Sequence, residues 1–250
     1  MAFTIHNLGW SAHMTGDVGL AATLYKESLS MARQVGDQWS VFWNLLQLAV
    51  LHRSQARYMQ AQELLEECLA SATALRSPLK QANVLSGLAE LELAQGNHDA
   101  ARLLLQQCLK IHSALGNTRD VALMHIDLGW TSARMGDLVE AQHYFRTALK
   151  EATLPGMQPE ILGSLLGLAS LFAAAPSVET RLRAARLLSA IRTHAALLGA
   201  VIQDPVNAVR LAAIDEALKA HLPSSVHCQA MAEGQEFSLD DAVSCGLGER

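Results

Sequence analysis

The residues best suited to chemistry in this chain are its four cysteines and ten histidines. Cys68 and Cys108 could act as a pair of thiols, since a thiolate is a strong nucleophile and metal ligand. They occupy, however, the same position of a 40-residue pattern as Ser28 and Ala148, where each copy has a small side chain. Packing is therefore the favoured role of both cysteines, because a free cysteine also behaves as a small apolar residue.

The other candidates for catalysis and metal binding lack partners at the spacing that their chemistry requires. Cys228 follows His227, and His221 lies six residues before His227, but no second pair of ligands completes a zinc site. The carboxylate pairs Glu66–Glu67 and Asp240–Asp241 are expected at a helix surface and a helix start, which gives acid–base catalysis no support. No histidine pairs with a serine or cysteine in a recognisable nucleophilic arrangement. The sequence thus predicts no catalytic residue, no metal ligand, no cofactor and no enzymatic activity.

Charge and hydropathy narrow the classes of partner. The 19 basic and 24 acidic residues are scattered in mixed order and leave a net charge of −5, so direct binding to nucleic acid or to an anionic membrane is not expected. The longest uncharged run, residues 161–178, contains glycine, serine and proline, which disfavours a membrane span. The cysteines form no disulfide framework and the first residues do not resemble a signal peptide, so a cytoplasmic protein is expected.

A 40-residue internal repeat organises the chain. Leu8-Gly9 is followed at this interval by Leu48-Ala49, Leu88-Ala89, Leu128-Gly129 and Leu168-Ala169. Three further columns keep the same step over four copies: Gly16, Ala56, Gly96 and Gly136; Ala21, Ala61, Ala101 and Ala141; Tyr25, Leu65, Leu105 and Phe145. Such a period indicates a repeat architecture built from one supersecondary unit.

Each copy is expected to be a helical hairpin. Apolar residues fall at helical spacing on both sides of the Gly16 column, which predicts two helices joined by a tight turn. A glycine followed by a capping side chain, as in Gly36-Asp37, ends one hairpin and starts the next. The small residues of the Gly9 and Ala21 columns would let the two helices cross closely. Because one hairpin cannot bury its apolar face alone, the hairpins should stack.

The expected fold is all-α, a right-handed superhelical solenoid of about five antiparallel helix hairpins with a C-terminal helical cap. A period of 40 suits HEAT or armadillo repeats, but the order of the columns resembles the tetratricopeptide (TPR) pattern with lengthened helices. The predicted repeats span residues 1–37, 38–77, 78–117, 118–157 and 158–198. Residues 199–250 should form the cap, with helices over 205–221, 224–233 and 239–247, the last beginning at a capping box of Ser238 and Asp241.

Two C-terminal stretches resemble one bacterial family. The run QAMAEGQEFSLDDAV, residues 229–243, is similar to the Trp-Ala-Glu-Gly-Arg and Ser-Leu-Glu-Glu-Ala stretches that close the TPR (MalT-like) region of STAND-type signalling ATPases, which include LuxR-type transcriptional regulators. Met231 stands here for the tryptophan and Gln235 for the arginine. The run AARLLSA, residues 184–190, and the first hairpin's Leu8-Gly9-Trp10 and ARQVGD, residues 32–37, are similar to the same family.

The resemblance implies a sensory or regulatory superhelix that normally follows a nucleotide-binding module. This chain has no Gly-x-x-x-x-Gly-Lys-Ser/Thr loop for phosphates and no basic recognition helix, so it is expected to be a fragment of a longer regulator or a stand-alone interaction protein. The first expected function is a non-catalytic interaction or effector-sensing module of a signalling ATPase or transcriptional regulator. The alternative is a free-standing adapter that bridges two proteins. The expected partner is a protein or peptide segment, such as a neighbouring ATPase or regulator domain, or a small effector; the oligomeric state stays open.

The resemblance also implies where a partner would bind, because the first helix of each TPR hairpin lines the concave surface. The residue two positions after the column leucine should face this groove, together with residues one helical turn away. The predicted groove residues are His6, Trp10, His13, Trp43, Leu46, Arg53, Asn83, Glu90, Ile126, Trp130 and Arg134. Large aromatic side chains and arginine carry much of the binding energy at interfaces, but the rings could equally pack between neighbouring helices. That choice stays open for Trp10 and Trp130, since the other copies place Val50, Glu90 and Ser170 in their column.

Overall fold

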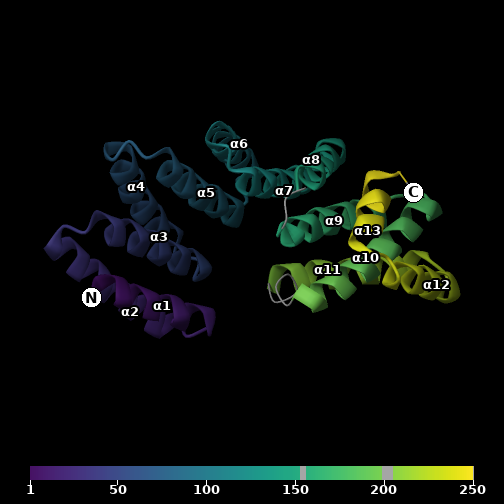
Figure 1. Cartoon of the computed structure of the whole chain (residues 1–250), viewed down its shortest axis with the longest axis horizontal. Coiled ribbons are helices and arrows are strands. Elements are labelled where there is room, and N and C mark those ends of the chain that lie inside the picture. Colours follow the sequence, from purple (N-terminus) through teal and green to yellow (C-terminus); the bar gives the residue numbers. More distant parts are fainter. Residues whose placement is uncertain (153–155, 199–204, 250) are drawn as a thin grey trace. The chain divides into compact units, whose positions relative to one another are not determined.

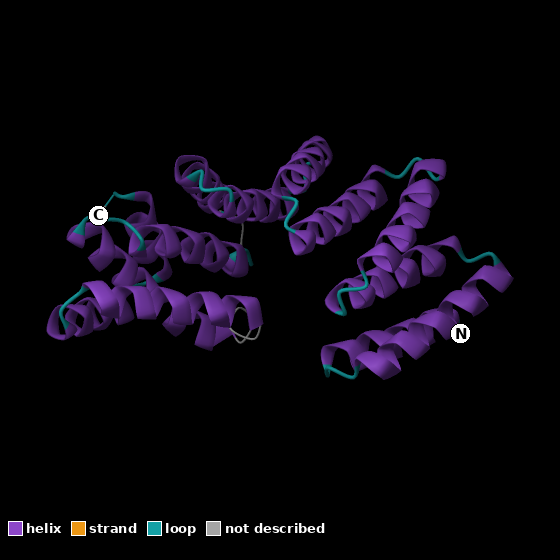
Figure 2. Cartoon of the chain, turned by 180° about the vertical axis from the view of Figure 1, so that it is seen from behind, coloured by secondary structure: helices purple, strands orange, loops and turns teal. Residues whose placement is uncertain are grey.

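The computed structural model describes residues 1–152, 156–198 and 205–249, and every regular element among them is an α-helix. Figure 2 shows these helices joined by loops. The chain divides into two compact units, Met1–Leu115 and Gly116–Arg250. Among the described residues, none of the helices is long and apolar enough to cross a membrane. The predicted all-α fold of repeated helix hairpins is confirmed.

Unit 1 consists of stacked hairpins, in each of which two consecutive helices pack together (Figure 1). The pairs are α1 (Ala2–Met14) with α2 (Val18–Val35), α3 (Gln38–Ser54) with α4 (Tyr58–Ala74), and α5 (Pro78–Gln95) with α6 (His98–Leu115). We call the first helix of a hairpin its A helix and the second its B helix. Each B helix packs against the next A helix, α2 on α3 and α4 on α5, and the A helices also contact one another in succession.

Unit 2 continues the hairpin pattern and then departs from it. Its hairpins are α7 (Thr118–Arg134) with α8 (Leu138–Glu151) and α9 (Gln158–Ala173) with α10 (Val178–Leu198), followed by α11 (Pro205–His221), α12 (Ser224–Gln235) and α13 (Leu239–Leu247). The last three helices agree with the segments expected from the sequence, α12 being two residues longer. The expected start of the cap at residue 199 lies outside the described residues, so the division into array and cap stays a prediction.

Residues with positive φ end the helices at the predicted turns. The turns within hairpins contain Gly16, Ala56, Gly96 and Gly136, and the predicted turns between hairpins contain Gly36, Arg76 and Gly116. Gly156, shortly before α9, also has a positive φ. Glycine adopts this left-handed conformation without steric cost. The second hairpin is the exception, because Ala56 at φ 55° and Arg76 at φ 48° carry side chains in a region that disfavours them.

Aspartates start several of the following helices. Asp17, Asp37 and Asp137 each accept a hydrogen bond from the backbone N–H three residues later, at 3.0, 3.2 and 3.0 Å. These contacts satisfy donors that have no partner inside the helix. Asn117 occupies the equivalent N-cap position of α7 without a capping hydrogen bond from its side chain.

The glycines of the two LGW stretches make room for an aromatic ring. A Cβ on Gly9 would lie 2.8 Å from the Tyr25 ring, and one on Gly129 would lie 2.6 Å from the Phe145 ring. Both rings are fully buried, and the Phe145 ring also lies against Gly167 of the next A helix, α9, where an added Cβ would collide with it. Where the B helix carries leucine instead, as in the second and third hairpins, the A helix carries alanine in the equivalent column. Ring and glycine thus compensate in volume, as close packing requires.

The small-residue column of the B helices joins each B helix to its A helix. The Ser28 hydroxyl donates to the Ala2 carbonyl oxygen at 2.7 Å, and the Cys68 thiol donates to that of Phe42 at 3.6 Å. The Cys108 thiol makes the same contact with Ala82 at 3.4 Å. All three side chains are buried, so the packing role expected for the cysteines is confirmed and includes a weak hydrogen bond.

The two C-terminal stretches that resemble the signalling family meet in the structure. Glu233 on α12 accepts a hydrogen bond from the Arg186 side chain on α10 at 2.7 Å. A Cβ on Gly234 would collide with the backbone carbonyl of Arg186, so α12 lies directly against α10. The capping box is confirmed, with Ser238 and Asp241 bonding each other's backbone N–H at the start of α13. This part of the pattern therefore holds helices together.

Candidate binding surface

The predicted groove residues are distributed over the A helices of the two units. Helices α1, α3 and α5 carry His6, Trp10, His13, Trp43, Leu46, Arg53, Asn83 and Glu90, whereas α7 carries Ile126, Trp130 and Arg134. We call the side of α1, α3 and α5 that carries the first eight residues the A face of unit 1. The corresponding side of α7 and α9, marked by Trp130, is the A face of unit 2.

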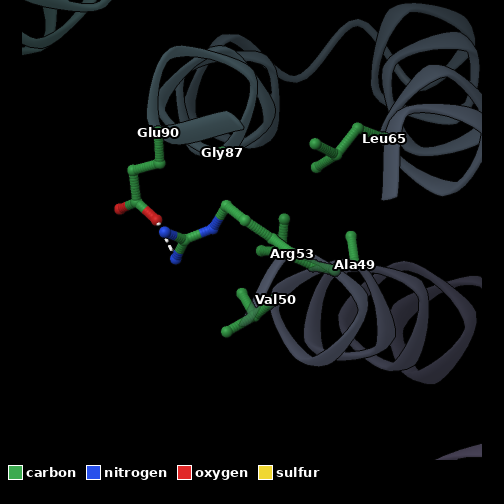
Figure 3. Close-up of a pocket in the computed structure, with 7 residues that line it drawn as sticks. Ala49, Val50, Arg53, Leu65, Gly87 and Glu90 are labelled. Carbon is green, nitrogen blue, oxygen red and sulfur yellow. Dashed lines mark ion pairs between the residues drawn. The ribbon is translucent and has the colours of Figure 1, made fainter. Parts of the chain in front are cut away.

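A small pocket brings three of these residues together on the A face of unit 1 (Figure 3). Leu46, Arg53 and Glu90 line it, and its other lining residues are Ala49, Val50, Leu65 and Gly87. Arg53 on α3 forms an ion pair with Glu90 on α5, with 2.5 Å between nitrogen and oxygen. Both charged side chains remain partly exposed. The pocket therefore has apolar walls from two hairpins and a pair of opposite charges that solvent can reach.

Trp10 and His13 lie one repeat before this pocket. Trp10 is 48% exposed and its ring lies edge-on to that of His13, with 6.3 Å between centroids. Val50 and Glu90, which line the pocket, occupy the column of Trp10 in the next two hairpins. An exposed indole and the charged pocket thus share one helical column of the A face.

Two aromatic residues that sequence reasoning missed extend this face. Phe3 is 51% and Trp39 is 45% exposed, and their ring centroids lie 5.4 Å apart. Trp39 also contacts the predicted groove residue Trp43, at 6.0 Å between centroids. The sequence did contain signals that place both residues on this face. Trp39 and Trp43 are four residues apart on one helix, and Phe3 precedes Trp43 by one period of 40 residues. Asn83, next in that column, is half-buried.

His6 belongs to a buried polar network and not to an open surface. Its Nδ1 lies 3.1 Å from the Asn44 side-chain oxygen, and the Asn44 amide donates to the Ser28 hydroxyl at 2.8 Å and to the Ser40 carbonyl at 2.6 Å. The network links α1, α2 and α3. Since buried polar groups need such partners, these side chains help to specify how the first two hairpins stack.

The three candidates in unit 2 have different surroundings. Ile126 is buried, and Arg134 is exposed at the end of α7. Trp130 is half-buried, with the Phe145 ring edge-on at 5.2 Å and the Arg210 guanidinium 3.8 Å from its ring centroid. Arg210 belongs to α11, so the C-terminal segment covers the indole that the sequence left unassigned. The two tryptophans of the LGW stretches therefore differ, since Trp10 is open and Trp130 is covered.

Burial is the main cause of the pKa shifts of three side chains in unit 1. Burial raises the pKa of the Cys68 thiol to about 12 and that of Tyr25 to about 12, so both stay protonated near neutral pH. Burial, with Arg57 and Lys26 nearby, lowers the pKa of His52. Within residues 1–152, 156–198 and 205–249, no group of three or more His, Cys, Asp or Glu side chains is placed to hold a metal ion.

Comparison with known proteins supports the repeat assignment. The tetratricopeptide repeat family matches residues 40–114 and, in an overlapping match, residues 80–150. No curated protein matches the chain in sequence.

Solved structures show a similar fold over most of the chain. BtubC (BKLC) from P. vanneervenii superposes with a TM-score of 0.65 at 20% identity, covering 91% of this chain and 90% of that one. A putative kinesin light chain with nearly identical TPR-like repeats from Podosopora anserina has a TM-score of 0.60 at 21% identity, and a point variant of that protein has 0.61 at 22%. Each covers 78% of this chain and 95% of its own. At such identity these likenesses establish the fold alone: the chain has a TPR-like helical-repeat fold, and its residues 40–150 match the tetratricopeptide repeat family.

Proposed function

We propose that this chain is a non-catalytic protein-interaction module that binds a partner segment on the A face of unit 1. One observation carries the proposal. The exposed Trp10 and the pocket residues Val50 and Glu90 occupy one column of three successive A helices, with Arg53 beside them. A partner lying along this column would meet a ring, an apolar wall and both signs of charge.

The physical chemistry of these side chains suits a peptide partner. Tryptophan and arginine are enriched among the residues that dominate interface energies, because each buries a large area and has a polar group to direct. The Arg53–Glu90 ion pair is partly exposed, and such pairs contribute only about 0–1 kcal/mol to folding. Arg53 and Glu90 can therefore exchange their mutual contact for contacts with a ligand at little loss of folding stability.

The finer proposal is that the module serves a cytoplasmic bacterial signalling ATPase or transcriptional regulator, with a neighbouring domain or small effector as ligand. Its support is the resemblance of residues 184–190 and 229–243 to the C-terminal region of such proteins. The alternative is a free-standing adapter. The mass of the native product separates them, because a longer polypeptide with a phosphate-binding loop favours the first and a product of this length the second.

A selection for peptide ligands tests the interaction face. A displayed peptide library is selected on the intact chain, and affinities are then measured for the wild type, Trp10→Ala and Arg53→Ala. Met59→Ala is the matched control, since Met59 is 78% exposed on the B helix α4. We expect each A-face substitution to weaken binding by about tenfold or more, as for interface residues worth above 1 kcal/mol, with helicity unchanged. Equal affinities for all four proteins would refute the assignment.

A further inference from the structure

Helix α11 stands outside the succession of hairpins. In each hairpin stack a B helix packs along the A helix that follows it, and α12 takes this place on α10, directly against its backbone at Gly234. Helix α11 contacts α9 and α10 and places Arg210 on Trp130 of α7. The helix thus lies on the A face of unit 2. Helix α10 is already covered by α12 in the place where a following helix would pack.

The buried side of α11 is an apolar stripe that continues one residue beyond the end of the helix. Leu211, Ile214, Leu218 and Leu222 are all buried and follow one another at intervals of three or four residues. Val209 on the opposite side is 70% exposed. An amphipathic helix in an apolar groove is recognised by this spacing of anchors.

Polar contacts fix the register of α11 in the groove. The Arg210 guanidinium lies over the Trp130 ring, a cation–π contact that adds orientation to the apolar anchors. The Asp215 carboxylate accepts hydrogen bonds from Arg192 on α10 at 3.2 Å and from Lys219 within α11 at 3.0 Å. His227 on α12 lies 3.4 Å from the other Asp215 oxygen. Arg210 and Asp215 thus tie α11 to two different helices of the repeat array.

We propose that the A face of unit 2 is a helix-binding groove that α11 occupies in cis, and that the partner it fits is an amphipathic helix with the pattern of α11. The pattern begins with an arginine, as at Arg210. Leucine follows that arginine after one, eight and twelve positions, isoleucine after four and aspartate after five. A partner helix of this kind binds where α11 lies and displaces it. Because α11 and the partner compete for the groove, the apparent affinity for the partner equals the intrinsic affinity multiplied by the fraction of chains in which α11 is released. The inference goes beyond the proposed function, which concerns unit 1.

The decisive probe is a labelled peptide of residues 205–222, titrated into the full chain by fluorescence anisotropy. Ile214→Glu places a charge at a buried anchor and should release α11, whereas Val209→Glu changes the exposed side. We expect the peptide to bind Ile214→Glu about tenfold or more tightly than it binds Val209→Glu or the wild type, and a peptide lacking the arginine to bind more weakly. Trp10→Ala should leave this binding unchanged, which separates the test from that of the proposed function.

Hydrogen exchange of the wild type keeps the inference testable if Ile214→Glu does not fold. Amides of α11 should exchange about tenfold or more faster than those of α9 and α12, because a displaceable helix opens without the rest of unit 2. Exchange of all three helices at one rate would make α11 an integral part of the core and overturn the inference. So would a folded Ile214→Glu chain that binds no peptide.

Discussion

Replacing Ala56 by glycine should stabilise unit 1, although it removes a methyl group. Ala56 stands in the turn column with φ at 55°, where the equivalent residues of the neighbouring hairpins are Gly16 and Gly96 at φ 82°. A side chain in the left-handed region costs roughly 1–2 kcal/mol. Glycine relieves that strain but gains freedom in the unfolded chain, which costs about 0.4–1 kcal/mol. The net gain should be about 1 kcal/mol, equivalent to about 2–4 °C in melting temperature for a chain of this size.

Two further variants separate the free-energy cost of the left-handed backbone conformation from the effect of the lost methyl group. Gly96→Ala is the reverse change in the same column, and a Cβ there would have no heavy atom of another group within 4 Å, so its expected loss of about 1 kcal/mol contains no steric clash. Ala70→Gly removes the same methyl group as Ala56→Gly from an exposed position inside α4 and should cost about 0.5–1 kcal/mol.

Urea unfolding followed by far-UV circular dichroism measures all three free energies of unfolding. The expected order is Ala56→Gly above the wild type, with Gly96→Ala and Ala70→Gly below it. If Ala56→Gly lost as much stability as Ala70→Gly, the turn of the second hairpin would not hold Ala56 in the left-handed region, and the reasoning from the repeat column would be refuted.

Two other predictions concern the C-terminal packing and the cysteines. Gly234→Ala should destabilise the chain by about 1–3 kcal/mol because the new methyl group collides with the Arg186 carbonyl, whereas Gly19→Ala, in a helix with space around it, should stabilise by up to about 1 kcal/mol in the same urea titration. In the folded chain iodoacetamide should modify the exposed Cys228 and spare Cys68, whose pKa of about 12 keeps the thiol protonated, as peptide mass spectrometry would show. Modification of both cysteines at similar rates would contradict the burial of Cys68.

Much of the fold was predictable because its determinants are local and repeated. The turn glycines, the helix-starting aspartates and the apolar spacing each act over a few residues. A period of 40 repeats the leucine column in five copies and the turn column in four. The candidate site was harder to predict. The choice of A-helix columns did bring Leu46, Arg53 and Glu90 together. Phe3 and Trp39 were missed, although their spacing to Trp43 was a signal, because the columns were chosen around the repeat leucine.

The two LGW stretches show what the repeat pattern cannot predict, which is the tertiary environment of equivalent residues. The sequence alone determines that Gly9 and Gly129 occupy equivalent positions. Both must be glycine because the rings of Tyr25 and Phe145 fill the space that a Cβ would need. Only the tertiary structure decides that Trp10 stays open while Trp130 is covered by Arg210. The reason is physical: α11 lies outside the repeat, and its place depends on contacts such as that of Arg210 with Trp130, 80 residues earlier, for which no periodic signal exists.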